Sequence, residues 1–230
     1  MTAHLTFDIW SDVMCPWCII GYKQLETALG TLDDEITAEI RWRPFELNPD
    51  MASGGEDSAA HLARKYGRTA QQSADARSRM SEMAEAAGYS FRYTGAVSDG
   101  SEPPAARLWN TFLAHKLLVH TLRAHGAEAQ TRLKLALFDA HFQQRRDVSD
   151  RAVLTEIYAG VGLPAYEAEI AFDDPVLGDL VRAEEAQALD LNISGVPAMV
   201  VGGRFLIPGA QDPETYTSAL RRAVERGMAA

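Results

Sequence analysis

The most reactive side chains of the 230-residue sequence are its two cysteines, Cys15 and Cys18. A thiolate attacks a disulfide through a mixed-disulfide intermediate, and a second thiol three positions away can then resolve that intermediate. Since the sequence holds no further cysteine, it predicts no structural disulfide elsewhere. Any redox chemistry is therefore expected within Cys15-Pro16-Trp17-Cys18.

The segments around this motif predict a strand, a loop and a helix. Residues 5–10 alternate apolar and polar side chains, which is typical of a strand, and Pro16 suits the first position of a helix that ends near Gly30. Backbone N–H groups and the helix dipole at an N-terminus lower a cysteine pKa. We therefore expect Cys15 to be the nucleophile and Cys18, one turn further along, to be the more buried, resolving cysteine.

Pro16 and Trp17 separate the two cysteines and are predicted to contact substrate. The Trp17 indole has no positive charge with which to stabilise a thiolate, but it offers a flat apolar surface and one N–H donor.

The sheet is expected to resume in two further places. Residues 40–43 form a predicted strand that ends at Pro44, and residues 198–201 and 204–207 form a predicted hairpin around Gly202-Gly203. Asp212 before Pro213 is the expected N-cap of a last helix. Strand, helix and strand open an α/β fold of the thioredoxin type.

Between these parts the pattern is helical. Residues 53–58 are predicted to be a linker, and Asp174-Pro175 is predicted to cap a helix that runs to about Leu191, with Asn192 in a left-handed conformation. We expect a thioredoxin-like domain made of residues 1–50 and 176–230, with an all-helical domain inserted at residues 51–175. Helix boundaries are expected at Gly67, Gly88, Glu102-Pro103-Pro104, Gly126 and Gly162.

The charge and hydropathy exclude some functions. A formal net charge of −10 argues against a nucleic-acid partner, because such proteins neutralise phosphates with Lys and Arg. No run approaches the roughly 20 apolar residues of a membrane helix, so no membrane association is expected. The first residues contain no charged leader followed by an apolar run, from which we expect a cytoplasmic protein.

A second motif lies far along the chain. Ser194-Gly195-Val196-Pro197 stands just before the predicted hairpin, and together with the C-P-W-C motif it resembles the thioredoxin superfamily. In that superfamily the proline is cis and lies against the cysteine pair. The resemblance therefore implies a cis peptide bond at Pro197, which is realistic only for X–Pro bonds.

More specifically, the chain resembles the DsbA-like oxidoreductases of the FrnE type over nearly its whole length. The resemblance implies that the Val196 backbone pairs with a bound polypeptide and that Pro197 keeps metal away from the thiols. Pro208 is a mild departure, because a small polar residue is expected there. The matching segments are Asp12–Cys18 with Gly21, Arg43–Pro49, Asn110-Thr111 with Ala114-His115, Gly195–Pro197 and Gly209–Gln211.

This resemblance implies a thiol–disulfide oxidoreductase or isomerase that acts on protein or peptide thiols and disulfides. No cofactor is expected for such an enzyme, and glutathione is a candidate redox partner. The alternative enzyme is a kappa-class-like, glutathione-dependent isomerase or transferase, in which a serine stands at the position of Cys15. Since this chain keeps both thiols, the sequence favours the oxidoreductase.

The cysteine motif has three other interpretations. A zinc site needs partners that the motif lacks, and His115, His120 and His125 recur every five positions, which steps around a helix rather than holding one face. No metal is therefore expected. The second interpretation is that the two cysteines are buried and chemically inert. A redox-switched binding module is the third, and a bridge between adjacent helical turns constrains little beyond its own turn. His115 and Asn110 are expected to be structural and stay outside the catalytic set.

Overall fold

The computed structural model describes residues 2–52, 54–67, 69–97 and 101–229. Within them, a four-stranded sheet has the order β2-β1-β5-β6 and a separate two-stranded ribbon pairs β3 with β4. The elements are, in chain order, β1 (Ala3–Ser11), α1 (Pro16–Thr31), β2 (Ile36–Pro44), β3 (Glu56–Asp57), α2 (Ser58–Tyr66), α3 (Ala70–Ala86), β4 (Arg107–Leu108), α4 (Phe112–Phe142), α5 (Arg151–Gly160), α6 (Ala165–Asp173), α7 (Pro175–Asp190), β5 (Ala198–Val201), β6 (Phe205–Pro208) and α8 (Pro213–Glu225).

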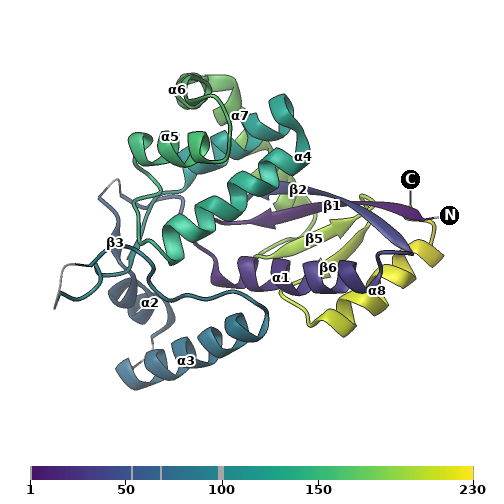
Figure 1. Ribbon diagram of the computed structural model, residues 1–230, viewed down its shortest axis with the longest axis horizontal. Helices are drawn as coiled ribbons and strands as arrows, with labels where there is room; N and C mark the ends of the chain where they lie inside the picture. Colours follow the sequence, from purple (N-terminus) through teal and green to yellow (C-terminus); the bar gives the residue numbers. More distant parts are fainter. Residues whose placement is uncertain (1, 53, 68, 98–100, 230) are drawn as a thin grey trace.

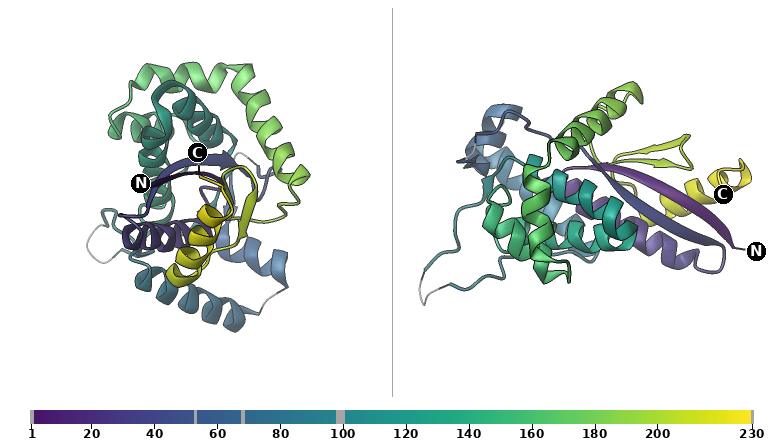
Figure 2. Two further views of the ribbon diagram at one scale, coloured as in Figure 1. Left: turned by 90° about the vertical axis from the view of Figure 1, so that its right-hand side faces the viewer. Right: turned by 90° about the horizontal axis from the view of Figure 1, so that it is seen from above.

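The sheet is that of a thioredoxin fold. β1 runs parallel to β2 and antiparallel to β5, and β5 and β6 form a hairpin. α1 and α8 lie side by side on one face of the sheet, α7 lies toward the other face, and α4 runs along the β2 edge (Figures 1 and 2). The predicted α/β class with a thioredoxin-like fold is confirmed.

Local sequence signals account for several of these elements. Pro16 and Pro213 occupy first-turn positions, and the Asp174 and Asp212 side chains accept hydrogen bonds from backbone N–H groups at the starts of α7 and α8. Asn192 has a φ of 57°, as expected of a left-handed cap. A capping side chain satisfies a backbone donor that otherwise has no partner within the helix.

Two predicted boundaries are wrong. Glu102-Pro103-Pro104 starts no helix: this stretch has no regular structure, Arg107–Leu108 pairs with Glu56–Asp57, and α4 begins only at Phe112. For the same reason the predicted linker at residues 53–58 holds a short strand and the start of α2, with Ser53 outside the described residues. The helix boundary expected at Gly126, by contrast, is confirmed: Gly126 has non-helical backbone angles (φ 83°, ψ 179°) and divides α4 into two helical segments.

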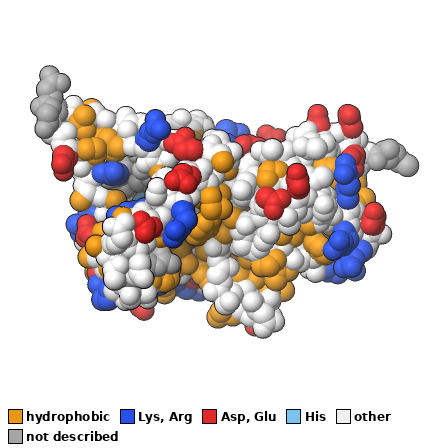
Figure 3. Space-filling model, turned by 90° about the horizontal axis from the view of Figure 1, so that it is seen from below, with side chains coloured by type: hydrophobic (Ala, Val, Ile, Leu, Met, Phe, Trp, Pro, Cys, Tyr) orange, Lys and Arg blue, Asp and Glu red, His pale blue; other side chains and the backbone are white. Residues whose placement is uncertain are grey.

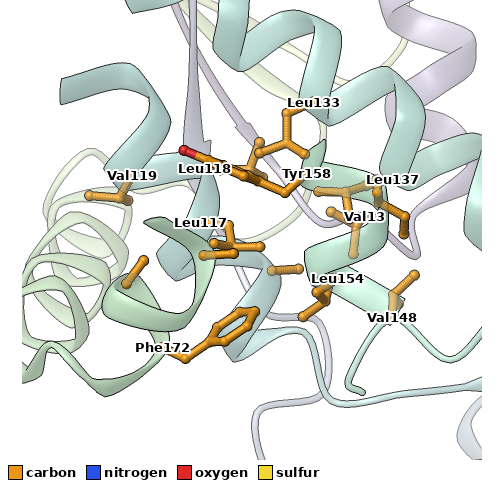
Figure 4. Close-up of a cluster of buried hydrophobic side chains, with 14 of the residues drawn as sticks. Val13, Leu117, Leu118, Val119, Leu133, Leu137, Val148, Leu154, Tyr158 and Phe172 are labelled. Carbon is orange, nitrogen blue, oxygen red and sulfur yellow. The ribbon is translucent and has the colours of Figure 1, made fainter. Parts of the chain in front are cut away.

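Each of the two large clusters of buried hydrophobic side chains includes residues from both the thioredoxin-like part and the helical part of the chain. Val13, from the loop after β1, lies among the helical side chains around Leu117, Leu133 and Tyr158 (Figure 4). Conversely, Phe138 of α4 belongs to the cluster beneath the sheet, where its ring lies 6.2 Å from that of Trp42. The helices thus pack directly on the loop that carries the cysteines. The boundaries proposed for the inserted domain remain a prediction.

Among the described residues, no helix is both long enough and apolar enough to span a bilayer.

Candidate active site

The cysteine motif begins at the point where the chain turns from β1 into α1. Cys15 is the N-cap of α1, with extended backbone angles (φ −87°, ψ 111°), and Pro16 takes the first helical position. Both cysteines are free thiols, and they are 3% and 1% exposed. The predicted arrangement, with one thiol at the tip of the helix and the other a turn further in, is what the structure shows.

The second predicted motif lies against the first. The Val196–Pro197 peptide bond is cis, as the resemblance implied, and the Cys15 thiol donates to the Val196 carbonyl oxygen across 3.6 Å. The Gly209 N–H donates to the Pro197 carbonyl oxygen at 2.8 Å, which ties this loop to the end of β6. Residues 181 positions apart in the sequence therefore form one site.

Gly21 explains how α1 comes so close to this loop. A Cβ at Gly21 would lie 3.2 Å from Pro197 Cγ and 3.2 Å from both Cα and Cβ of Ala210. Contacts this short require the neighbouring atoms to move, so a side chain there would push α1 away from the loop.

The outer side of the motif is more accessible than the sulfur atoms. Trp17 is 40% exposed, and Pro16 and Val196 are half-buried. On the face seen from below, hydrophobic side chains gather near the middle, between more strongly charged ends (Figure 3). All six predicted site residues thus meet at one place, with an apolar indole beside the reactive pair.

Charged groups that sequence reasoning missed lie beneath the pair. Lys134 of α4 is fully buried, donates to the Ser11 carbonyl oxygen at 3.3 Å, and packs against the rings of Trp42 and Phe138. Burial lowers the pKa of Lys134 to about 8, although the nearby Cys18, Asp12 and Cys15 oppose that shift. A lysine within an amphipathic helix pattern usually marks the solvent-facing side of the helix. The sequence therefore gave no sign that Lys134 is buried beside the cysteines.

Asp12 is the second buried charge. It accepts hydrogen bonds from the backbone N–H groups of Met14 (3.2 Å) and Leu47 (2.8 Å). Burial acts to raise its pKa, but the nearby His115 imidazole, the Leu47 N–H and Lys134 together hold that pKa below its usual value. His115 Nε2 lies 3.8 Å from Asp12 Oδ1, too far for a hydrogen bond. His115 is thus buried beside the site, and no described residue hydrogen-bonds to its Nε2.

The two thiols titrate as a pair. Burial acts to raise the pKa of Cys18, but the neighbouring Cys15 thiol and the positive charge of Lys134 lower it. The hydrogen bond to Cys18, followed by burial, raises the pKa of Cys15. The first proton is therefore lost from the pair as a unit, and Lys134 is the positive charge near the resulting thiolate.

His141 of α4 is a further buried imidazole. Burial lowers the pKa of His141 to about 4, so this side chain is neutral at neutral pH. No cofactor-binding motif emerged from the sequence. A group of three potential metal ligands in the described chain, formed by His120, His125 and Glu167, includes neither cysteine.

The fold and this buried dithiol define the class of protein. Residues 6–221 match the DSBA-like thioredoxin domain family, and the chain belongs to that family. It is therefore related to thiol–disulfide redox enzymes.

Individual relatives agree with this assignment. A crystal structure of a probable DsbA oxidoreductase from Streptomyces coelicolor superimposes with a TM-score of 0.84 at 31% identity, covering 96% of this chain and 91% of that one. The uncharacterised protein YwbO of Bacillus subtilis is 26% identical over 96% of each chain. The cytosolic disulfide reductase DsbM of Pseudomonas aeruginosa shares the fold, with a TM-score of 0.64, 16% identity, and coverage of 96% of this chain and 98% of its own.

Proposed function

We propose that this chain exchanges disulfides with protein or peptide substrates, with Cys15 as the nucleophile and Cys18 as the resolving thiol. The observation that carries the proposal is the placement of the Cys15 sulfur at the helix tip, 3.6 Å from the Val196 carbonyl oxygen of the cis-proline loop. Cys18 lies one turn deeper, on the side of Lys134. This order of access favours Cys15 as the attacking atom.

The proposed reaction has two exchange steps. The Cys15 thiolate attacks one sulfur of a substrate disulfide, which forms a mixed disulfide and releases the other substrate sulfur as a thiolate. The Cys18 thiolate then attacks the Cys15 sulfur, which releases the second substrate thiolate and closes the Cys15–Cys18 disulfide. Two electrons and, after protonation, two protons have passed to the substrate. The reverse sequence oxidises a dithiol substrate.

Substrate contacts are proposed at four residues. Trp17 and Pro16 offer an apolar surface beside the sulfurs, and the backbone of Val196 next to cis Pro197 is suited to pair with an extended polypeptide. Trp17 is the most exposed of these side chains, so we expect it to contribute most of the apolar contact with substrate.

The direction and the setting of the reaction are also proposals. In a reducing cytoplasm, reduction or isomerisation is favoured over net oxidation, and glutathione can return the Cys15–Cys18 disulfide to the dithiol. The fold shared with a cytosolic disulfide reductase fits this setting. We propose a cytoplasmic reductase or isomerase that needs no bound cofactor.

The test is to trap the mixed disulfide. In Cys18→Ala the resolving step is removed, so a substrate with a disulfide should remain covalently attached through Cys15 and be recovered by non-reducing electrophoresis and mass spectrometry. The matched control is Cys15→Ala, which should trap little because Cys18 is deeper. If the two variants trapped substrate equally, or neither trapped any, the assignment of roles would be wrong.

The kappa-class-like alternative predicts a different result. A glutathione-dependent isomerase uses one glutathione-binding position and does not cycle through a Cys15–Cys18 disulfide. Equilibration in glutathione redox buffers, followed by thiol alkylation, distinguishes the two. A reversible two-electron transition of the pair supports the oxidoreductase, and its absence supports the alternative.

A further inference from the structure

Two histidines and a glutamate of the helical region meet outside the cysteine site. His120 and His125 come from α4, and Glu167 comes from the first turn of α6. Their nearest ligand atoms all lie within 4.8 Å of one another. None of these three side chains belongs to the cysteine site described above, so their close approach needs a separate explanation.

The sequence argument against a ligand group considered the surface of one helix. Positions five apart on α4 do point in different directions, but the third ligand comes from another helix and lies within reach of both imidazoles. Glu167 Oε2 is 3.4 Å from His120 Nε2 and 2.6 Å from His125 Nε2. The kink of α4 at Gly126 follows directly after His125, so this imidazole stands at the end of its helical segment.

We propose that His120, His125 and Glu167 bind a divalent transition-metal ion of the zinc type. Zinc takes imidazole nitrogen and carboxylate oxygen at about 2.0–2.2 Å, which places neighbouring tetrahedral ligand atoms about 3.3 Å apart. The distance from His120 Nε2 to Glu167 Oε2 already has about this value, and that from His125 Nε2 to Glu167 Oε2 must open by about 0.7 Å to reach it. Two histidines and a carboxylate leave one position for water.

The surroundings of Glu167 fit a metal ligand. The Tyr158 hydroxyl donates a hydrogen bond to Glu167 Oε2 at 3.3 Å. Carboxylate ligands are commonly oriented by such a second hydrogen bond. The three ligand side chains are about a fifth to a quarter exposed, so an ion can enter while much of the site stays shielded. A bound ion would link α4 to α6.

Zinc binding must be measured with the cysteines blocked, because thiolates also bind zinc. The full-length protein is first oxidised so that Cys15 and Cys18 form their disulfide, and Zn²⁺ is titrated by calorimetry. We expect one ion per chain. Glu167→Gln and His120→Gln should each weaken binding at least tenfold, Tyr158→Phe should weaken it less, and His4→Gln, at a histidine of β1, should leave it unchanged.

Two readouts keep the test decisive. Thermal unfolding without metal checks that each variant folds, and His125→Gln, at the most exposed ligand, replaces any variant that does not. Co²⁺ in place of Zn²⁺ should give the strong visible absorption of tetrahedral coordination in the unsubstituted protein and in His4→Gln, but not in Glu167→Gln or His120→Gln. Absence of saturable binding in the oxidised protein, or binding that Glu167→Gln and His120→Gln leave unchanged, would overturn the proposal. Neither outcome bears on disulfide exchange.

Discussion

Lys134 and Asp12 place opposite charges under the Cys15–Cys18 turn, and both are withdrawn from water. Burying a charge is costly unless other groups compensate for it. Here the compensation for Lys134 comes from the Ser11 carbonyl, from Asp12 and from a thiolate on Cys18. The reduced, ionised pair is thereby stabilised relative to the disulfide, which makes the disulfide more oxidising.

Replacing Lys134 with methionine tests this electrostatic role. Loss of the positive charge should raise the pKa of the first thiol to ionise by about 1 unit, which is about 1.4 kcal/mol. If that thiol is ionised at the working pH, the reduction potential should fall by up to about 30 mV. The measurement is the rate of thiol alkylation as a function of pH, together with a glutathione redox titration.

Lys116 provides the matched control. It lies on the same helix and is also buried, but it donates to the Phe172 carbonyl oxygen among the helical side chains. Lys116→Met should leave the pH profile of alkylation in place. An unchanged profile in Lys134→Met would show that the thiol pKa is set by the helix tip alone.

The sequence located the cysteine pair and the cis proline that the structure brings together, but it gave no sign of the charged groups beneath them. The spacing of Cys15 and Cys18 identified the cysteine pair, whereas Pro197 was identified through the resemblance to the thioredoxin superfamily. Lys134, Asp12 and His115 act through contacts between segments distant in the sequence, and nothing in the local pattern distinguishes a lysine beneath a thiol from one in water.

At the scale of elements, the approach of α1 to the cis-proline loop depends on a missing side chain. Gly21→Ala should lower the free energy of unfolding by about 1–3 kcal/mol, because the new Cβ meets Pro197 and Ala210 at 3.2 Å. Denaturant unfolding measures this change, and the alkylation rate of Cys15 reports displacement of the loop.

Gly30 is a matched control on the same helix. A Cβ there has no neighbour within 4 Å, so Gly30→Ala should stabilise the protein by up to about 1 kcal/mol through the better helix propensity of alanine. Equal effects of the two substitutions would contradict the packing argument.

Helix starts were predicted where a capping side chain or a proline acts within one turn, as at Asp174 and Asp212. The prediction failed at Glu102-Pro103-Pro104 because the neighbouring Arg107–Leu108 forms a strand with Glu56–Asp57, fifty residues upstream. Proline is tolerated in extended chain as well as in a first helical turn, so its presence could not decide between the two.

At the scale of the whole molecule, the two large hydrophobic clusters are linked through α4 and through the loop after β1. Phe138 is fully buried under the sheet and Val13 is fully buried among the helices. Each such side chain contributes about 1.5–3 kcal/mol through burial. Neither cluster is complete without a residue from the other part of the chain.

We therefore expect the helical and sheet regions to unfold together. Fluorescence of the buried Trp10 and Trp42 reports on the sheet, and far-ultraviolet circular dichroism is dominated by the helices. The two signals should give coincident urea transitions with the same midpoint. Two separated transitions would show that the helical region is an independent folding unit.

At the outer edge of the sheet, the backbone of β2 is protected at Trp42 from pairing with another strand. The Gln130 side chain accepts from the Trp42 N–H at 2.8 Å and donates to the Trp42 carbonyl at 2.8 Å, as a neighbouring strand would do. Exposed strand edges are templates on which other chains add and aggregate. At Trp42 the protein fills that template with one of its own amide side chains, so a second molecule finds no free backbone pair there from which to extend the sheet.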